Sequence, residues 1–213
     1  MKIAVIGDYI LDLYIYGTVD RISPESPIPI FKENYKETKP GGSGNVAANL
    51  KALGADILHY HDDVYYPIKQ RFVCDNHIMF RSDIENYIIN YDKEFDLTDV
   101  GFCILSDYNK GYLHYSEEII DYCHSKNCKV VVDPKKHLRN YRNADFIKLN
   151  QKEIRDFTDG EDYREILSKY NIGSLIITRG ADGVDIVTRD FETHIDCDKH
   201  QISDVTGAGD VFI

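Results

Sequence analysis

Ser203-Asp204-Val205-Thr206-Gly207-Ala208-Gly209-Asp210 is the segment from which the fold class of this 213-residue chain can be inferred. Its small residues 207–209 allow a sharp turn in which successive backbone N–H groups approach an anion, and Asp210 adds a carboxylate. Such a turn suits phosphoryl transfer, because the N–H groups can hold the developing charge and the carboxylate can accept the proton of an attacking hydroxyl. The alternative is a plain glycine-containing loop before a helix, which the flanking acidic and hydroxyl residues make less favoured.

A second glycine-rich segment, Pro40-Gly41-Gly42-Ser43-Gly44-Asn45-Val46-Ala47, lies near the start of the chain. The two segments resemble the C-terminal and N-terminal signatures of the ribokinase-like (PfkB) carbohydrate kinases, and they occur in the order typical of that family. Two further segments, Arg21-Ile22-Ser23-Pro24-Glu25-Ser26-Pro27-Ile28-Pro29 and Leu105-Ser106-Asp107-Tyr108-Asn109-Lys110-Gly111, are most similar to the D-glycero-β-D-manno-heptose-7-phosphate kinases within the family. The resemblance therefore implies a sugar kinase.

The implied fold is a single α/β domain over residues 1–213. It would be a three-layer α/β/α sandwich with a mostly parallel central sheet and a small β lid, formed by residues 13–38 and 67–83. The residue pattern agrees, because short apolar runs alternate with helical patterns from residue 100 onward. We expect short strands within 14–30, where prolines suit an edge or a loop. We expect further strands over 3–6, 57–60, 69–73, 78–81, 100–105, 129–132, 144–149, 175–178, 184–188 and 192–195, and helices over 46–53, 116–125, 151–157 and 163–170.

Two regions depart from the family pattern. After Ala55, only residues 56–66 fill the space in which relatives have a further strand, turn, helix and strand, so we expect the region 55–66 to be shortened. Relatives also continue with further helices beyond the position of Asp210, and we expect these to be missing here. The expected result is an incomplete nucleotide half in which the turn 207–209 is poorly held, which leaves the activity of the chain in doubt.

The resemblance assigns the sugar to residues near the start of the chain. Asp12 would accept hydrogen bonds from sugar hydroxyls, and Gly42, Gly44 and Asn45 would contact the sugar closely. The alternative for Asp12 is a solvated or capping carboxylate. The alternative for the glycine-rich segment is a turn that begins a core helix.

Four cations are candidates for binding a phosphate on the sugar. Lys69, Arg71 and Arg81 lie on a predicted hairpin around residues 75–77, and cations at alternating strand positions share one face. Lys110 follows the strand 100–105. Such cations in an otherwise acidic protein suit a substrate that already carries a phosphate, because arginine matches phosphate oxygens bidentately. The alternative is solvated charge that protects an edge strand.

The nucleotide is assigned first to the segment around residue 150. Asn150 and Glu153 have the N-x-x-E spacing of the family's magnesium and phosphate motif, and they would order the water shell of Mg²⁺ from one face of a helix start. Lys148 would reach an ATP phosphate. Alternatively, Asn150 caps the helix and Glu153 completes a capping box; both interpretations can hold together.

A second nucleotide segment, Thr178-Arg179-Gly180-Ala181-Asp182-Gly183-Val184, resembles the family turn that passes beneath the nucleotide. Its candidate residues are Thr178, Gly180 and Gly183, together with Thr206 from the first segment. A bare hairpin is the alternative here.

Composition restricts the remaining possibilities. The formal net charge of −11 argues against a broad nucleic-acid or anionic-membrane surface. Five scattered cysteines without paired metal spacing indicate reduced thiols. No apolar run approaches the roughly 20 residues of a membrane span, so we expect a soluble, cytoplasmic protein. The acidic loop with His59, His61, Asp62 and Asp63 is interpreted as solvated rather than as a metal site.

The predicted reaction is in-line transfer of the γ-phosphoryl group of ATP, with Mg²⁺, to the anomeric hydroxyl of a heptose 7-phosphate. Asp210 would be the general base, and the amides of Gly207, Ala208 and Gly209 would form the anion hole. By resemblance, the β lid implies a homodimer. The alternatives are a degenerate kinase that binds a sugar phosphate or serves as a partner subunit without catalysis, and a kinase for another sugar.

Overall fold

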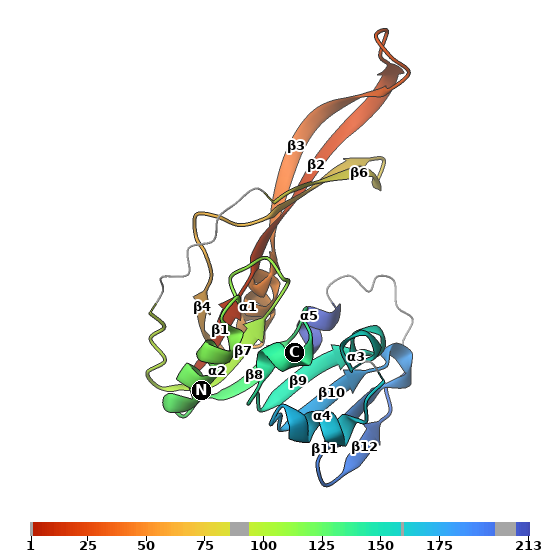
Figure 1. The fold of residues 1–213 in the computed structure, drawn as a ribbon. Coiled ribbons are helices and arrows are strands. Elements are labelled where there is room, and N and C mark those ends of the chain that lie inside the picture. Colours follow the sequence, from red (N-terminus) through yellow and green to blue (C-terminus); the bar gives the residue numbers. More distant parts are fainter. Residues whose placement is uncertain (1, 86–93, 159, 199–207) are drawn as a thin grey trace.

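The computed structural model describes residues 2–85, 94–158, 160–198 and 208–213, and within them the chain forms a main sheet and a separate lid sheet (Figure 1). The described part of the main sheet has eight strands. All neighbouring strands pair in parallel except β10 with β11 and β11 with β12. In spatial order they are β12 (Glu192–Ile195), β11 (Val184–Thr188), β10 (Ser174–Thr178), β9 (Phe146–Asn150), β8 (Lys129–Asp133), β7 (Val100–Ser106), β1 (Lys2–Gly7) and β4 (Asp56–Tyr60).

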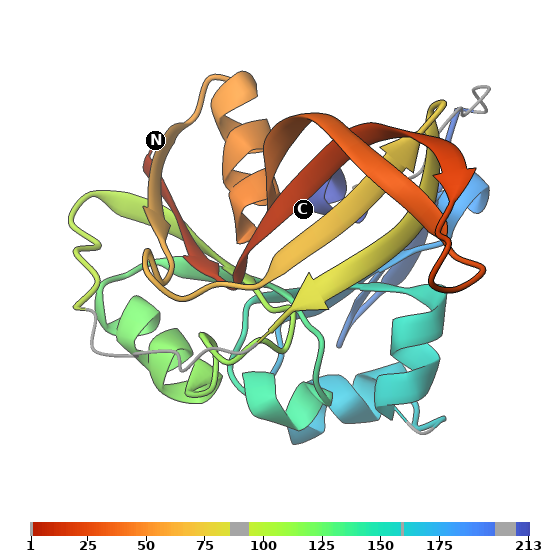
Figure 2. The same ribbon diagram turned by 90° about the horizontal axis from the view of Figure 1, so that it is seen from above.

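Helices cover both faces of the main sheet. Along β1, Ala4 and Ile6 pack into the larger apolar cluster with α2 (Ser116–Ser125), α3 (Gln151–Thr158) and α4 (Tyr163–Lys169). Val5 points the other way and packs with α1 (Ser43–Ala52). This alternation is the period of two of a β-strand, and the two helical layers are visible on opposite sides of the sheet (Figure 2). The predicted three-layer α/β/α architecture is confirmed.

The elements expected in the second half of the chain are present, with bounds that shift by at most two residues. The central strands β7, β8 and β9 are largely buried and therefore read as apolar runs, which makes them recognisable from sequence, whereas β12 at the edge of the sheet is exposed. Two short 3₁₀ helices, η1 (Leu138–Tyr141) and η2 (Gly180–Asp182), complete this half.

The lid differs from the short strands expected within 14–30. β2 (Tyr9–Ile22) and β3 (Pro29–Gly42) are each 14 residues long and form an arm that extends away from the main body (Figure 1). β5 (Ile68–Cys74) and β6 (His77–Ile84) complete a sheet in the order β3-β2-β5-β6. The prolines do not shorten the arm, because Pro29 and Pro40 lie on β3 at the edge of this sheet, where a missing N–H is tolerated.

The residues that follow the glycine-rich turn form a short helix, although the turn was expected to be poorly held. α5 (Ala208–Phe212) is five residues long, and Ile213 packs against the smaller apolar cluster of Val5, Val46, Ala47 and Ile104. This packing and contacts between α5 and α1 fix the end of the chain against the sheet.

Among the described helices, none is both long and apolar enough to cross a membrane.

Candidate active site

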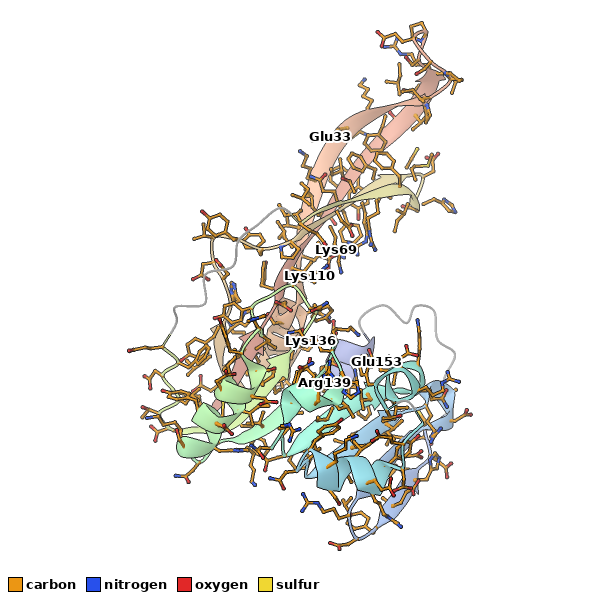
Figure 3. The ribbon with its side chains drawn as sticks, in the orientation of Figure 1. Glu33, Lys69, Lys110, Lys136, Arg139 and Glu153 are labelled. Carbon is orange, nitrogen blue, oxygen red and sulfur yellow. The ribbon has the colours of Figure 1, made fainter. Side chains whose placement is uncertain are left out.

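Polar side chains from four strands meet at the carboxyl ends of the main sheet. Asp8 follows β1, Asp107 follows β7, Asp133 ends β8 and Asn150 ends β9. These four strands are adjacent and parallel, so the structure places the four side chains along one rim. Ligands of open α/β sheets bind at this edge. In Figure 3, Lys69 lies on the lid, and Lys110, Lys136 and Glu153 lie below it toward the rim, whereas Glu33 lies far up the arm.

Asp8 is buried and holds the loop that follows β7. Its Oδ2 accepts the backbone N–H groups of Tyr108 at 2.8 Å and Lys110 at 3.0 Å, and its Oδ1 accepts the N–H of Tyr112 at 2.9 Å. Burial raises the pKa of Asp8, and these N–H donors oppose the rise. The loop is thus fixed by a carboxylate at the end of the neighbouring strand.

Asp107 fixes the same loop from within. Its Oδ1 accepts the backbone N–H of Asn109 at 2.6 Å, and its Oδ2 accepts the hydroxyl of Tyr141 at 2.7 Å. The ammonium of Lys136 lies 3.2 Å from Oδ2. Sequence reasoning includes Asp107 in a segment singled out by resemblance but identifies neither Tyr141 nor Lys136, because no spacing links these residues.

Asp210, the predicted general base, projects from α5 toward residues of the N-terminal half. Its Oδ2 accepts the side-chain amide of Asn45 at 2.8 Å, and its Oδ1 accepts the hydroxyl of Tyr108. Asn45 and Asp210, both predicted site residues, are therefore brought together although they are 165 residues apart in the chain. Tyr108 belongs to a segment singled out by resemblance, yet no sequence signal assigned a role to it.

The glycines assigned to the sugar are packed against β2. Gly42 has a φ of 57°, and a Cβ there would lie 2.3 Å from the carbonyl oxygen of Asp8. A Cβ on Gly44 would lie 2.6 Å from the ring of Tyr9. Both positions thus require glycine for close packing at the start of α1, which places the Asn45 side chain beside Asp210.

Two of the four predicted phosphate-binding cations lie near the site. Arg71 pairs with Asp12 at 2.5 Å, and the ammonium of Lys69 lies 6.0 Å from the centre of the Tyr108 ring. Burial lowers the pKa of Lys69, and the nearby cations Arg81, Arg71 and Lys110 lower it further, against the opposing charge of Asp12. Asp12 is therefore in an ion pair and not simply solvated.

The other two cations are engaged elsewhere. Arg81 is opposite Arg71 in the β5–β6 pairing, but its guanidinium contacts Asp83 at 2.8 Å and is half exposed. The ammonium of Lys110 pairs with Glu85, while its backbone belongs to the loop that Asp8 holds. Both side chains would have to change partners to reach a ligand.

Lys148 lies at the junction of the rim and the glycine-rich turn. It forms a buried ion pair with Asp133, with 3.2 Å between Nζ and Oδ1. A Cβ on Gly209 would lie 3.1 Å from the Lys148 ammonium, which shows how close that ammonium is to the turn. Burial raises the pKa of Asp133 to about 6, with Glu153 adding to the rise and Lys148 opposing it.

Asn150 and Glu153 form the capping box that was the alternative interpretation. Asn150 Oδ1 accepts the N–H groups of Lys152 and Glu153 at 2.9 Å, and Glu153 Oε2 accepts the N–H of Asn150 at 3.0 Å. Glu153 Oε1 also accepts the ammonium of Lys135. Both lone pairs of the Asn150 oxygen are thereby occupied, whereas the Glu153 carboxylate retains acceptor capacity.

A cavity of about 570 Å³ lies between the β11–β12 hairpin and α5. The predicted nucleotide residues Thr178, Gly180 and Gly183 line it together with Gly209. The other lining residues are mainly apolar and were not predicted: Ala181, Val184, Ile195, Asp196, Cys197 and Phe212. Its volume is in the range of sites that hold small organic ligands.

Three predicted residues of the turn are beyond detailed description. Thr206 and Gly207 lie outside the described residues, and Ala208 is the first residue of α5.

The acidic segment with His59 and His61 is packed against aromatic side chains and is not solvated as expected. The ring of His61 stacks on Tyr9 with 4.7 Å between centres, and His59 Nε2 lies 2.9 Å from Ser43 Oγ. Among the described residues, no group of three or more histidine, cysteine, aspartate or glutamate side chains is arranged to hold a metal ion.

Comparisons with known proteins agree with this geometry. Residues 100–213 match the pfkB family of carbohydrate kinases. The bifunctional protein HldE of Shewanella loihica is 31% identical over 258 residues, which cover all of this chain and 54% of that protein. The HldE protein of Photorhabdus laumondii gives the same identity and coverage. The chain thus spans about half the length of the curated relatives it matches.

Solved structures show the same fold at low sequence identity. The ligand-free nucleoside kinase of Burkholderia thailandensis has a TM-score of 0.70 at 19% identity, over all of this chain and 84% of that one. The Thermotoga maritima ribokinase has a TM-score of 0.66 at 18% identity, over 99% of this chain and 82% of that one. An Arabidopsis thaliana ribokinase complexed with ribose and ATP has a TM-score of 0.67 at 14% identity, over 99% and 82%.

Proposed function

The chain belongs to the pfkB family of carbohydrate kinases, and on this premise we propose that it transfers the γ-phosphoryl group of ATP to the anomeric hydroxyl of a heptose 7-phosphate. The observation that carries the proposal is the environment of Asp210. Its carboxylate is held by Asn45 and Tyr108 beside a rim of buried polar groups, at the start of a helix that also faces the cavity. A positioned carboxylate of this kind can accept the proton of the attacking hydroxyl as the phosphorus–oxygen bond forms.

The charged face of the lid supports an acceptor that already bears a phosphate. Asp12, Lys69 and Arg71 occupy one face of the lid sheet, because Asp12 pairs in register with Lys69 and Arg71 is two residues further along β5. The position of Lys69 over Tyr108 directs this face toward Asp210. If Lys69 and Arg71 bind the phosphate of the sugar phosphate, the opposite end of the sugar would lie near Asp210. Asp12 would then accept hydrogen bonds from the sugar hydroxyls.

The cavity between the hairpin and α5 is the proposed site for the adenine nucleotide. Its apolar lining suits a heterocyclic base, and Gly209 connects it to Lys148 at the rim. The Lys148 ammonium would contact a phosphate, and the amides of the turn 207–209 would hold the transferring group. Mg²⁺, when bound, would neutralise charge on the phosphates.

The donor set around Asn150 fits a water-mediated Mg²⁺ site in part. Glu153 offers carboxylate oxygens, which are the hard ligands that Mg²⁺ and its water shell prefer. The Asn150 oxygen is saturated by two backbone donors, so its side-chain NH₂ is the group left to contact a phosphate or water. We therefore assign the organisation of the water shell to Glu153 and a donor role to Asn150.

The outer face of the lid supports a homodimer. Phe72 stacks on Phe80 with 4.2 Å between ring centres, and Phe31 meets Phe72 edge to face at 5.4 Å. Phe80 and Ile84 remain 51% and 42% exposed on the face opposite Lys69 and Arg71. An apolar surface on one face of a sheet whose other face is charged suits a second copy of the chain.

The direct test is turnover by the purified protein with Mg·ATP and a panel of sugars and sugar phosphates. ADP release with a heptose 7-phosphate, and at least about 100-fold loss in Asp210→Asn, are expected, because a general base contributes roughly 10²–10⁴ in rate. Calorimetry should show that Asp210→Asn still binds the sugar phosphate. Asp121→Asn, on α2, is the matched control, since its carboxylate contacts only Asn143 among the hydrogen bonds of the described structure.

Each other outcome has a distinct meaning. Retention of near-full activity in Asp210→Asn would disprove the assignment of the base. Binding of the sugar phosphate by the unsubstituted protein with no turnover would identify a binding protein instead of an enzyme. Turnover with a different sugar alone would correct the acceptor and keep the chemistry.

A further inference from the structure

Tyr108 is one of the two residues whose side chains hold the carboxylate of the proposed base. Its hydroxyl donates a hydrogen bond to Oδ1 of Asp210, 102 residues away in the chain. Asn45 donates to the other oxygen of the same carboxylate, at 2.8 Å. The plane of the Asp210 carboxylate is therefore defined by one donor on each oxygen, from two different parts of the chain.

The loop that carries Tyr108 is held at several points. The buried carboxylate of Asp8 accepts three backbone N–H groups of this loop, including that of Tyr108 itself at 2.8 Å. Asp107 accepts the N–H of Asn109 at 2.6 Å, and Asn109 adopts a φ of 55° in the resulting tight turn. The backbone on both sides of Tyr108 is therefore anchored to the rigid end of the sheet independently of the contact with Asp210.

The Tyr108 side chain is also partly buried and remains protonated. Burial is the main cause of its raised pKa, and the hydrogen bond to Asp210 and the negative charges of Asp210, Asp133 and Asp12 add to it. The phenol is thus a permanent donor. On its ring face lies the ammonium of Lys69 from the lid, 6.0 Å from the ring centre.

We propose that Tyr108 is a positioning residue that fixes the orientation of the Asp210 carboxylate, and this inference rests on the proposed function of Asp210 as the general base. Tyr108 transfers no proton. It holds Oδ1 and, together with Asn45 on Oδ2, fixes the directions in which the remaining lone pairs of the carboxylate point. A carboxylate has about four acceptor sites, so the donors from Tyr108 and Asn45 leave sites for the sugar hydroxyl on both oxygens.

The same geometry explains how the base is held in one orientation. α5 is packed through Ile213, which fixes the helix but not the side-chain torsions of Asp210. The two donors supply the missing restraint. Correct alignment of a reacting group accounts for large factors in rate, so loss of one donor should reduce turnover without removing either substrate site.

The test is Tyr108→Phe, which removes the hydroxyl and keeps the ring under Lys69. A hydrogen bond to a charged group contributes roughly 1.5–3 kcal/mol, which corresponds to about a 10- to 100-fold loss of kcat. The KM values for ATP and for the sugar phosphate should change by less than about threefold. Tyr122→Phe is the matched control, because its hydroxyl donates to the carbonyl oxygen of Phe95 at 2.8 Å, away from the rim; its kcat should equal that of the unsubstituted chain.

A double-variant cycle separates positioning from general damage. In an Asp210→Asn background, Tyr108→Phe should lower the residual turnover by less than about twofold, because its effect passes through Asp210. Equal effects of Tyr108→Phe in both backgrounds, or a kcat unchanged in the single variant, would overturn the proposal. A loss confined to KM would show that Tyr108 binds substrate and would also overturn it.

A second measurement works without turnover and so distinguishes failure of this inference from failure of the proposed function. The free energies of unfolding in urea of the unsubstituted chain, the two single variants and the double variant should show coupling between Tyr108 and Asp210. If the unfolding free energies are coupled but the protein has no kinase activity, the contact between Tyr108 and Asp210 is confirmed and the proposed function is rejected. Kinase activity without coupling, and with an unaffected kcat in Tyr108→Phe, would reject the inference and retain the function.

Discussion

Lys148 and Asp133 form an ion pair inside the protein, with 3.2 Å between Nζ and Oδ1 and side chains that are 6% and 8% exposed. The ammonium also lies against Gly209 at the start of α5. Buried ion pairs contribute little to stability, because the cost of removing both charges from water offsets their attraction. The location of this pair beneath the glycine-rich turn therefore argues for a role in binding a phosphate.

Replacement of Lys148 should separate the structural from the functional contribution of the pair. In Lys148→Met, Asp133 is left buried without its partner, and the free energy of unfolding should fall by about 3 kcal/mol. In Lys148→Met with Asp133→Leu, stability should largely return because no buried charge remains. Both variants should lack turnover, because Lys148 is absent from each. Urea unfolding and an ADP-release assay measure the two quantities, and a double variant with restored activity would contradict the role of Lys148.

Protonation of Asp133 should give the stability a dependence on pH. Burial raises the pKa of Asp133 from 3.8 to about 6, so the folded chain keeps a proton between about pH 4 and 6 that the unfolded chain has lost. The contribution of this group to stability is therefore present at low pH, decreases as pH rises through this window and is constant above it. Between pH 4.5 and 7 the decrease should be about 2 kcal/mol.

The carboxyl carbon resonance of Asp133 measures this directly. The resonance can be assigned by its absence in Asp133→Asn, and its titration should have a midpoint near 6. A midpoint near 4 would mean that Lys148 compensates fully for burial. In that case the free energy of unfolding should change with pH in the same way in the unsubstituted chain and in Asp133→Asn.

The centre of the main sheet could be predicted because its strands β1, β7, β8 and β9 are largely buried and stand out as apolar runs between turn residues. The length of the lid arm could not. Pro29 suggests a break in a strand, yet its place at the start of an edge strand allows continuous pairing of β2 with β3. The length of the arm is set by the pairing of β2 with β3, and no local sequence pattern shows which segment a strand will pair with.

The candidate site shows the same division between local and distant information. Asn150 and Glu153 could be located because a spacing of three on a helix start is a local feature, although the capping box uses the same spacing. Tyr108 could not be assigned, since its partner is 102 residues away and a tyrosine in a loop has no characteristic spacing. Asp8 has three partners just as remote in sequence.

Gly183→Ala should damage the cavity beside α5. Gly183 has a φ of 97°, and a Cβ there would lie 2.1 Å from the carbonyl oxygen of Ile195 on β12. The backbone must shift, so the hairpin that lines the cavity should open and affinity for ATP should fall by at least about tenfold, an effect of roughly 1.4 kcal/mol. Gly54→Ala is the control, because Gly54 has a φ of 85° with open space around it and should lose only about 1 kcal/mol of stability. Equal ATP affinity in the two variants, measured by calorimetry, would contradict the assignment of the cavity.

Arg71→Met should discriminate between acceptors with and without a phosphate. The KM for a phosphorylated sugar should rise by about 10- to 100-fold, since a charge-assisted contact is lost, while the KM for the same sugar without its phosphate should change little. Arg81→Met should have the smaller effect, because the Arg81 side chain is 52% exposed, against 15% for Arg71, and is paired with Asp83. The exposed Lys51 of α1 provides a distant cation control in Lys51→Met. Similar KM increases for both forms of the sugar would show that Arg71 acts through Asp12 and not on the phosphate.

Phe80→Glu should convert the protein from a dimer to a monomer. Phe80 stacks on Phe72 on the apolar face of the lid and is half exposed, so a second lid placed against this face would bury it, and a carboxylate there would be costly to desolvate. Arg81→Gln is the control on the same strand, because neighbouring residues of a strand point to opposite faces. Sedimentation velocity should find the unsubstituted chain and Arg81→Gln as dimers, and Phe80→Glu as a folded monomer. If the unsubstituted chain sediments as a monomer at tens of micromolar, the apolar face has another partner; if Phe80→Glu remains dimeric, the copies associate through a different surface.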